Sequence, residues 1–237
     1  MKFRASIISA LFLAPLFLFL GCGVKVDTVL AADQSAKVEL TAAIHPVLQA
    51  YLKDLGGDTK DFFSETAIRK RFTAEKGLTV LHLSATTDKG ISLGLKVADI
   101  RQLLAGKSGD VRNAVSLKTE GGKTHLVLTL NRSAIESFLG MGGNAADLKY
   151  LLPQDKALTA KQYQEQLNWA LEEYGTASQL GDMFKTSLIK LSLTVPGPVV
   201  SAKGFTIIDR QAGVVGLELG LVELLTLHTN IVNEVVY

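Results

Sequence analysis

Cysteine, proline and tryptophan are scarce in this chain. Of its 237 residues, one is Cys, five are Pro and one is Trp. A single Cys excludes both an internal disulfide and a structural zinc site built from cysteines. No long linker rich in Pro, Ser and Gly divides the sequence.

The chain also lacks an excess of charge of either sign. It has 25 Lys and Arg against 23 Asp and Glu. Lys2 and Arg4 are the only charged residues before position 22, so the remainder of the chain is formally neutral. A general nucleic-acid binder needs a positive surface, and this composition excludes one. A hydrophobic content of 47% excludes intrinsic disorder.

Residues 1–22 have the layout of an export signal. Lys2 and Arg4 form a short basic region, residues 5–20 are almost wholly apolar, and Gly21 and Cys22 follow. This segment resembles a bacterial lipoprotein signal, although Phe19 stands where such signals usually have Leu. The resemblance implies a signal peptide at 1–21 and a mature chain at 22–237. It also implies that Cys22 carries a diacylglyceryl group, often with an acyl chain such as palmitate on its amine.

Two other interpretations of the N-terminus remain open. Ordinary secretion would follow from cleavage after Ala31. An uncleaved anchor would need the apolar run to span a bilayer, and its about 16 residues fall short of the roughly 20 required. The lipoprotein interpretation predicts an envelope protein that faces the periplasm or the cell surface.

Alternation of apolar and polar residues predicts a series of strand pairs. The expected strands are 24–30, 36–44, 78–84, 90–97, 115–120, 123–130, 189–195, 205–209, 214–219 and 231–237. Helices are expected after Pro46, after Ser64, at 100–105 and through about 133–185. In that last stretch the capping-box spacing occurs at Ser133/Glu136, Thr159/Gln162 and Thr176/Gln179.

Closely spaced hairpins favour an α+β fold with an antiparallel sheet and packed helices. We expect a single domain over 22–237, with about 133–185 as a helical insertion. Glu218, Glu223 and His228 interrupt the apolar C-terminal stretch, which therefore does not predict a terminal membrane helix.

The segment 191–204 reads LSLTVPGPVVSAKG, with Pro-Gly-Pro at its centre and a glycine at its end. Together with the lipidated Cys and the hairpin after it, this segment resembles bacterial lipoproteins with an LppM-like domain. The resemblance implies a role in the envelope or with lipids, and it supplies no catalytic residues. The helical insertion and the missing C-terminal membrane helix depart from it.

Motifs for catalysis or cofactor binding are not found. His45, His82, His125 and His228 are not spaced as metal ligands, and no G-x-S-x-G motif occurs. Residues 140–145 match G-x-G-x-x-A, but they follow a helical segment and are expected to form a connection between helices. We therefore expect no metal, no cofactor and no enzymatic activity.

Two further segments each allow two interpretations. Arg69-Lys70-Arg71 is either a solvated helix face opposite Ile68 and Phe72 or a contact with anionic lipid headgroups. The apolar segment Leu217–Leu227 is either a buried strand that turns into a short helix or the lining of an apolar cleft.

The sequence thus predicts a non-catalytic lipoprotein of the bacterial envelope that binds a lipid or an envelope protein. Two alternatives stay open: a tethered hydrolase with an unrecognised Ser/His/acid site, and a structural subunit of an envelope assembly.

Overall fold

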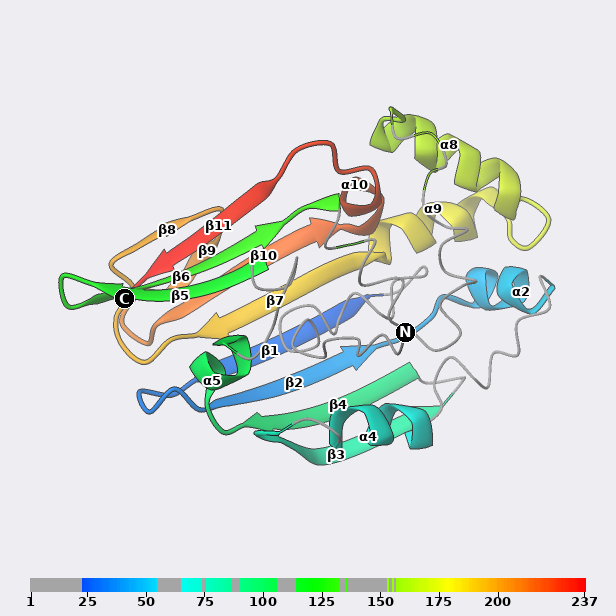
Figure 1. Cartoon of the computed structure of the whole chain (residues 1–237). Helices are drawn as coiled ribbons and strands as arrows, with labels where there is room; N and C mark the ends of the chain where they lie inside the picture. Colours follow the sequence, from blue (N-terminus) through cyan, green and yellow to red (C-terminus); the bar gives the residue numbers. More distant parts are fainter. Residues whose placement is uncertain are drawn as a thin grey trace, which may run out of the picture.

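The computed structural model describes residues 23–54, 65–73, 76–86, 90–105, 114–132, 135, 153, 155 and 157–237. This described part of the chain contains six helices and eleven strands, which form two sheets. The expected α+β class with a predominantly antiparallel sheet is confirmed (Figure 1).

The larger sheet has seven strands. They are β1 (Val24–Leu30), β2 (Ala36–Ala42), β3 (Leu78–Thr86), β4 (Gly90–Val97), β7 (Leu188–Thr194), β9 (Thr206–Asp209) and β10 (Val214–Gly220). Their order is β3-β4-β2-β1-β7-β10-β9. Every neighbouring pair is antiparallel except β1 and β7, which run parallel in the middle of the sheet. The sequence had indicated only antiparallel pairs.

The smaller sheet has four strands in the order β5-β6-β11-β8. They are β5 (Val115–Glu120), β6 (Lys123–Leu130), β8 (Ser201–Lys203) and β11 (Ile231–Val236). The strand β8 is missing from the list expected from alternation, because three residues are too few to show that pattern. Gly204 and Phe205 separate β8 from β9, so the chain passes from one sheet to the other at this point.

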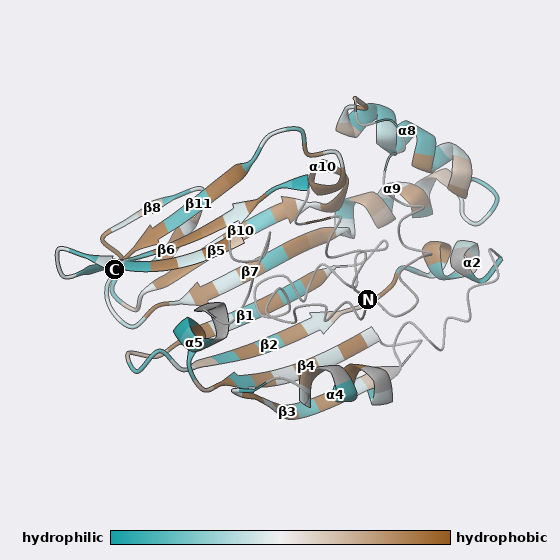
Figure 2. Cartoon of the chain, viewed as in Figure 1, coloured by the Kyte–Doolittle hydropathy of each residue, from teal (hydrophilic) through white to brown (hydrophobic). Residues whose placement is uncertain are grey.

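Alternation decides which side of each strand is buried. On β1 and β2 every second residue is buried, and the residues between them are exposed or half-buried. The same alternation colours the strands in bands in Figure 2. The buried side chains of both sheets belong to one hydrophobic cluster, which includes Val26 of β1, Leu193 of β7, Leu126 of β6 and Val235 of β11.

Tight turns join two of the strand pairs as expected. Gly121 and Gly122 both have positive φ and connect β5 to β6, which suits a two-residue hairpin. Between β1 and β2, the Asp33 carboxylate accepts a hydrogen bond from the Ser35 backbone N–H at 2.9 Å. The pKa of Asp33 is lowered by its hydrogen bonds with Ser35, first with the side chain and then with this backbone N–H. Gly90, also at positive φ, opens β4.

Six helices accompany the sheets. They are α2 (Pro46–Asp54), α4 (Glu65–Thr73), α5 (Ile100–Ala105), α8 (Ala160–Leu171), α9 (Ala177–Thr186) and α10 (Leu221–Leu225). Both α8 and α9 begin with the predicted capping boxes, at Thr159/Gln162 and Thr176/Gln179. The third predicted box, at Ser133/Glu136, and the N-cap at Ser64 lie outside the described residues.

Apart from α5, which contacts β5, the helices gather in two places. The helix α4 packs along the edge strand β3, whereas α2 contacts α8 and α9, and α10 contacts α8. This second group stands at the end of the large sheet where β1 begins (Figure 1). That one domain spans 22–237 stays a prediction.

Candidate functional site

The outward face of the large sheet is mostly polar on β1 to β4, although Val29 and Leu81 are exposed on these strands. On β1 to β4 the residues opposite the core include Lys25, Asp27, Lys37, Glu39, Thr41, Thr79, His82, Ser84, Ser92 and Lys96. All of them are exposed or half-buried. The face therefore presents titratable and hydroxyl groups on paired strands, and we take it as the candidate site.

His82 on the edge strand β3 reaches inward across this face. Its ring lies over Gly94 of β4, where an added Cβ would collide with the ring. The bare backbone at Gly94 leaves the space that the imidazole needs to reach across β4. A glycine inside a strand is a known sign of such a close approach, and it was the sequence signal that could have found this contact.

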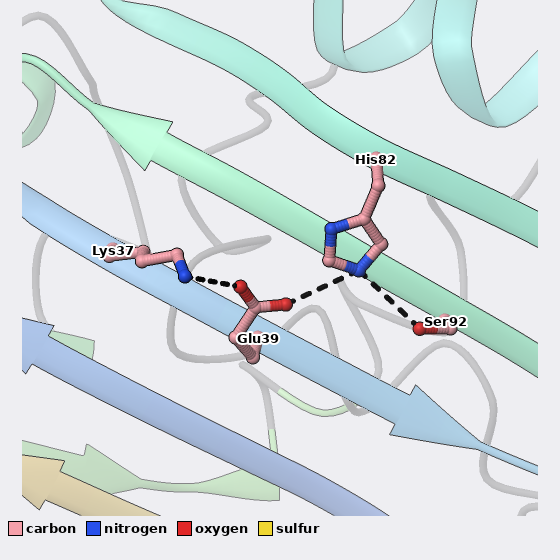
Figure 3. A network of polar contacts seen from close by, with 4 residues as sticks. All are labelled: Lys37, Glu39, His82 and Ser92. Carbon is pink, nitrogen blue, oxygen red and sulfur yellow. Dashed lines mark hydrogen bonds and ion pairs between the residues drawn. The ribbon is translucent and has the colours of Figure 1, made fainter.

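Four side chains form one polar network around His82 and Glu39, as Figure 3 shows. The His82 Nε2 lies 3.3 Å from Glu39 Oε2 and 3.5 Å from Ser92 Oγ. The other carboxylate oxygen of Glu39 pairs with Lys37 Nζ at 2.9 Å. The network thus joins β3, β4 and β2 on the solvent side of the sheet.

This set contains a Ser, a His and an acid, but not in the arrangement of a hydrolase triad. In a triad the acid binds one ring nitrogen and the Ser binds the other, so the acid orients the base. Here Glu39 and Ser92 both face Nε2 of His82. When Nε2 donates its proton to Glu39, it has no lone pair with which to accept a proton from Ser92. The network suits the binding of a polar group better than nucleophilic catalysis.

Two carboxylates face each other in the middle of this surface. Asp27 of β1 lies directly opposite Glu39 of β2 in the antiparallel register. Like charges in this position repel. Lys25 Nζ contacts Asp27 at 2.8 Å and Lys37 Nζ contacts Glu39 at 2.9 Å. Each carboxylate thus pairs with a lysine on its own strand, and these ion pairs offset the repulsion between the two carboxylates.

A second His–acid pair lies on the small sheet. His125 Nδ1 of β6 and Glu234 Oε1 of β11 are 2.8 Å apart, and both side chains are about one-third exposed. This pair has the acid on the ring nitrogen that a triad would use. Among the described residues, no Ser or Thr hydroxyl is within hydrogen-bond distance of its Nε2. The pair links the neighbouring strands β6 and β11 of the small sheet.

The remaining two histidines contact backbone groups. His45 Nδ1 accepts a hydrogen bond from the Val47 N–H at the start of α2, at 3.4 Å. His228 Nε2 lies 3.1 Å from the Leu158 carbonyl oxygen, which precedes α8. Across the residues that the structure describes, no group of three or more His, Cys, Asp or Glu side chains is placed to hold a metal ion.

The predicted lipidation residue, Cys22, lies immediately before the described chain and is itself outside it. Gly23 is exposed, and β1 begins at Val24. On its two sides β1 pairs with β2 and with β7 over nearly its full length. The sole Cys therefore leads, after one glycine, into a central strand of the large sheet.

The apolar segment Leu217–Leu227 is the end of a strand with half-buried leucines, and it turns into a short buried helix. Leu217 and Leu219 lie on β10 and pack against the core. Leu221, Val222, Leu224 and Leu225 of α10 are buried. These side chains stabilise the junction between the sheet and the helices.

The basic cluster at 69–71 lies on α4. Arg69 pairs with Glu65 at 3.0 Å, and Arg69 and Lys70 are exposed, while Phe72 is buried. These exposed side chains are compatible with either interpretation of the cluster, and the side chain of Arg71 is outside the described part. The G-x-G-x-x-A match at 140–145 also lies outside it.

Sequence reasoning gave no role to the only Trp. Trp169 on α8 is 76% exposed, the largest exposed fraction among the large hydrophobic side chains of the described residues. The apolar stripe of α8 predicts that Tyr163 and Leu171 are buried, as they are. Trp169 lies off that stripe, and this position is the sequence signal that could have indicated its exposure.

No known protein family, curated protein or solved structure matches this chain. Within the described residues, no helix has the length and apolarity needed to cross a membrane.

Proposed function

We propose that this protein is a lipoprotein of the bacterial envelope, anchored through Cys22, that binds a lipid or an envelope protein without catalysing a reaction. The resemblance to LppM-like domains is part of this proposal. The observation that carries it is the position of β1. Cleavage after Ala31, as in ordinary secretion, would remove a strand that pairs on both sides. Processing at Cys22 keeps that strand whole.

Mass spectrometry of the mature N-terminus tests the anchor. We expect a chain that starts at Cys22 and carries a diacylglyceryl group. A mature chain that starts at Ala32 or Asp33, without lipid, would contradict the proposal. Two acyl chains are needed for stable attachment, because one chain gives only marginal membrane binding.

Native mass spectrometry of the protein from its own envelope tests the binding role. A lipid that co-purifies at a fixed ratio supports the lipid-binding form of the proposal, and a stoichiometric protein supports the partner-binding form. The third possibility, a structural subunit, predicts a stable assembly with several copies of one partner.

A second candidate, a tethered hydrolase, rests on the network of His82, Glu39 and Ser92. Its test is hydrolysis of a simple nitrophenyl ester by the purified protein. If the protein hydrolyses the ester, and Ser92→Ala abolishes the activity while Ser84→Ala on the same face keeps it, the hydrolase is favoured. We expect no activity in any of the three proteins, because both partners of His82 compete for one ring nitrogen.

A further inference from the structure

A lipid anchor on Cys22 leaves the folded domain almost no distance by which it can move away from the membrane surface. A single residue, Gly23, separates Cys22 from the first residue of β1. Consecutive Cα atoms are about 3.8 Å apart. If Cys22 carries lipid, as the proposed function holds, the start of β1 lies within a few ångströms of the membrane surface. The parts of the fold around that point must then touch the membrane too.

Several helices surround the start of β1. A Cβ built on Gly23 would lie 3.4 Å from the carbonyl oxygen of Thr186, the last residue of α9. Val24 is opposite Ala42, where β2 ends shortly before α2, and it pairs with Ile189 at the start of β7. The helices α2, α8 and α9 are gathered at this end of the molecule in Figure 1, while the C-terminus is at the other end.

The C-terminal end of α8 is fixed against α2. The rings of Tyr51 and Tyr174 make an edge-to-face contact with centroids 5.4 Å apart. The Tyr174 hydroxyl donates a hydrogen bond to Asp54 at 2.6 Å. Because α2 leads back to β2, these contacts hold the last turn of α8 in place relative to the anchored strand.

Trp169 lies in the last turns of α8 and is 76% exposed. Indole rings favour the headgroup layer of a membrane, where the ring is partly desolvated and its N–H keeps polar partners. The side chains nearest to it along the helix are polar or acidic, with Glu165 four residues before it and Glu172 three residues after it, both exposed. This flank disfavours an anionic surface and favours a zwitterionic one.

We infer that the end of the domain formed by α2, α8 and α9 rests on zwitterionic lipid headgroups, with the Trp169 indole placed among them beside the Cys22 anchor. The inference rests on the proposed function, because it needs the short lipid tether. It adds a defined membrane-facing surface and an orientation: the strands of the large sheet point away from the membrane.

Because Trp169 is the only Trp of the chain, its fluorescence tests this orientation without any label. The lipidated protein, purified from cells that express the full chain, is reconstituted into phosphatidylcholine vesicles. We expect a blue shift of the emission maximum and quenching by phosphatidylcholine brominated near the headgroup. We also expect reduced quenching by acrylamide in the buffer.

A matched variant moves the indole to the far end of the sheet. Ile208 on β9 is 63% exposed and lies near Val214, which pairs with Thr194 at the end of β7 remote from Leu188. The double variant Trp169→Phe/Ile208→Trp therefore carries its only indole away from the anchored end. Its emission should be unchanged by vesicles and insensitive to the brominated lipid.

The outcomes separate the two proposals. An N-terminus without lipid, seen by mass spectrometry of the same sample, overturns the anchor and the orientation together. A lipidated protein whose wild-type and Ile208→Trp forms are quenched equally overturns the orientation alone. Protection of Trp169 only in native envelope membranes, and not in protein-free vesicles made from the lipids of those membranes, would identify a protein as the occupant and overturn the lipid assignment.

Discussion

The imidazole of His82 lies over the backbone of Gly94, and through this contact it reaches Glu39 two strands away. The strand β4 between them contributes no side chain at the crossing point. Three strands thereby share one polar contact on the open face of the sheet. The two residues should consequently depend on each other in stability measurements.

Substitution of Gly94 by Ala tests that dependence. A Gly in a strand costs about 0.5–1 kcal/mol relative to Ala. In a His82→Ala background, Gly94→Ala should therefore raise the free energy of unfolding by up to this amount, because the remaining close neighbour of the new Cβ is the end of the flexible Glu39 side chain, at 3.1 Å. In the wild-type background the new methyl group displaces the ring, and the gain should vanish or become a loss. Urea unfolding of the four proteins measures the coupling, and an equal effect in both backgrounds would contradict the contact.

Substitution of Gly204 by Ala should be more costly than the same change at Gly121. Both glycines have positive φ, which costs an L-residue roughly 1–2 kcal/mol. A Cβ at Gly121 meets nothing within 4 Å, whereas one at Gly204 collides with the side chain of Asn233. Asn233 is 1% exposed and has little room to move. Thermal unfolding compares the stability of the two variants. Equal losses of stability would show that the Asn233 side chain moves aside for the new methyl group.

Substitution of Thr176 by Ala should weaken α9. The Thr176 hydroxyl accepts a hydrogen bond from the Gln179 N–H at 3.3 Å, and the Gln179 side chain accepts one from the Thr176 N–H at 2.8 Å. Loss of such a cap costs about 0.5–2 kcal/mol. Ser178→Ala, an exposed change in the same helix, is the control and should leave the free energy of unfolding nearly unchanged.

Alkaline pH should release the contact between α2 and the turn after α8. The hydrogen bond to Asp54 raises the pKa of Tyr174 from its ordinary value of 10.0 to about 12. The folded state therefore holds this proton more tightly than the unfolded state does. Its contribution to stability is complete below pH 10.0 and is lost as the pH rises toward about 12.

Tyr174→Phe checks this linkage. The variant lacks the proton, so its stability should decline less steeply than that of the wild type between these two pH values. Burial also raises the pKa of Tyr163 and of Tyr237, so a smaller decline should remain in the variant. Urea unfolding at a series of pH values gives both slopes, and identical slopes would contradict the role of Tyr174.

Limited proteolysis tests the single domain over 22–237. We expect no stable fragment boundary at 131–133 or at 185–188. At the second position Ser187 is 2% exposed, and its hydroxyl donates to the Met183 carbonyl oxygen at 2.6 Å, which protects the chain between α9 and β7. Two fragments that fold independently would disprove the prediction.

Local signals in the sequence gave most of the secondary structure. The pair Gly121-Gly122 marks a hairpin, and Thr159 and Thr176 each mark a helix start, because the backbone geometry at these positions depends on a few adjacent residues. The predicted strand 36–44 ends earlier, at Ala42, because Ala43 to His45 lead into α2 instead of continuing the pairing with β1 and β4.

Pairing between distant segments could not be predicted in the same way. Nothing in the residues 24–30 indicates that their second partner is 188–194, since a strand with one buried face fits either direction of pairing. The contact of His82 with Glu39 depends on the order β3-β4-β2, which is also a property of the whole sheet. The exposure of Trp169 depends on which elements pack against α8, and this too is a property of the whole fold.

The parallel pair of β1 and β7 has a consequence for biosynthesis. Residues 31–187 must emerge before β1 meets its second partner, so the contact order is high and folding should be slow. Until then the strand nearest the N-terminus exposes one unpaired edge, which is a template for aggregation. A premature stop codon before position 188 would leave that edge permanently unpaired. The truncated product should then depend on chaperones and proteases for its removal.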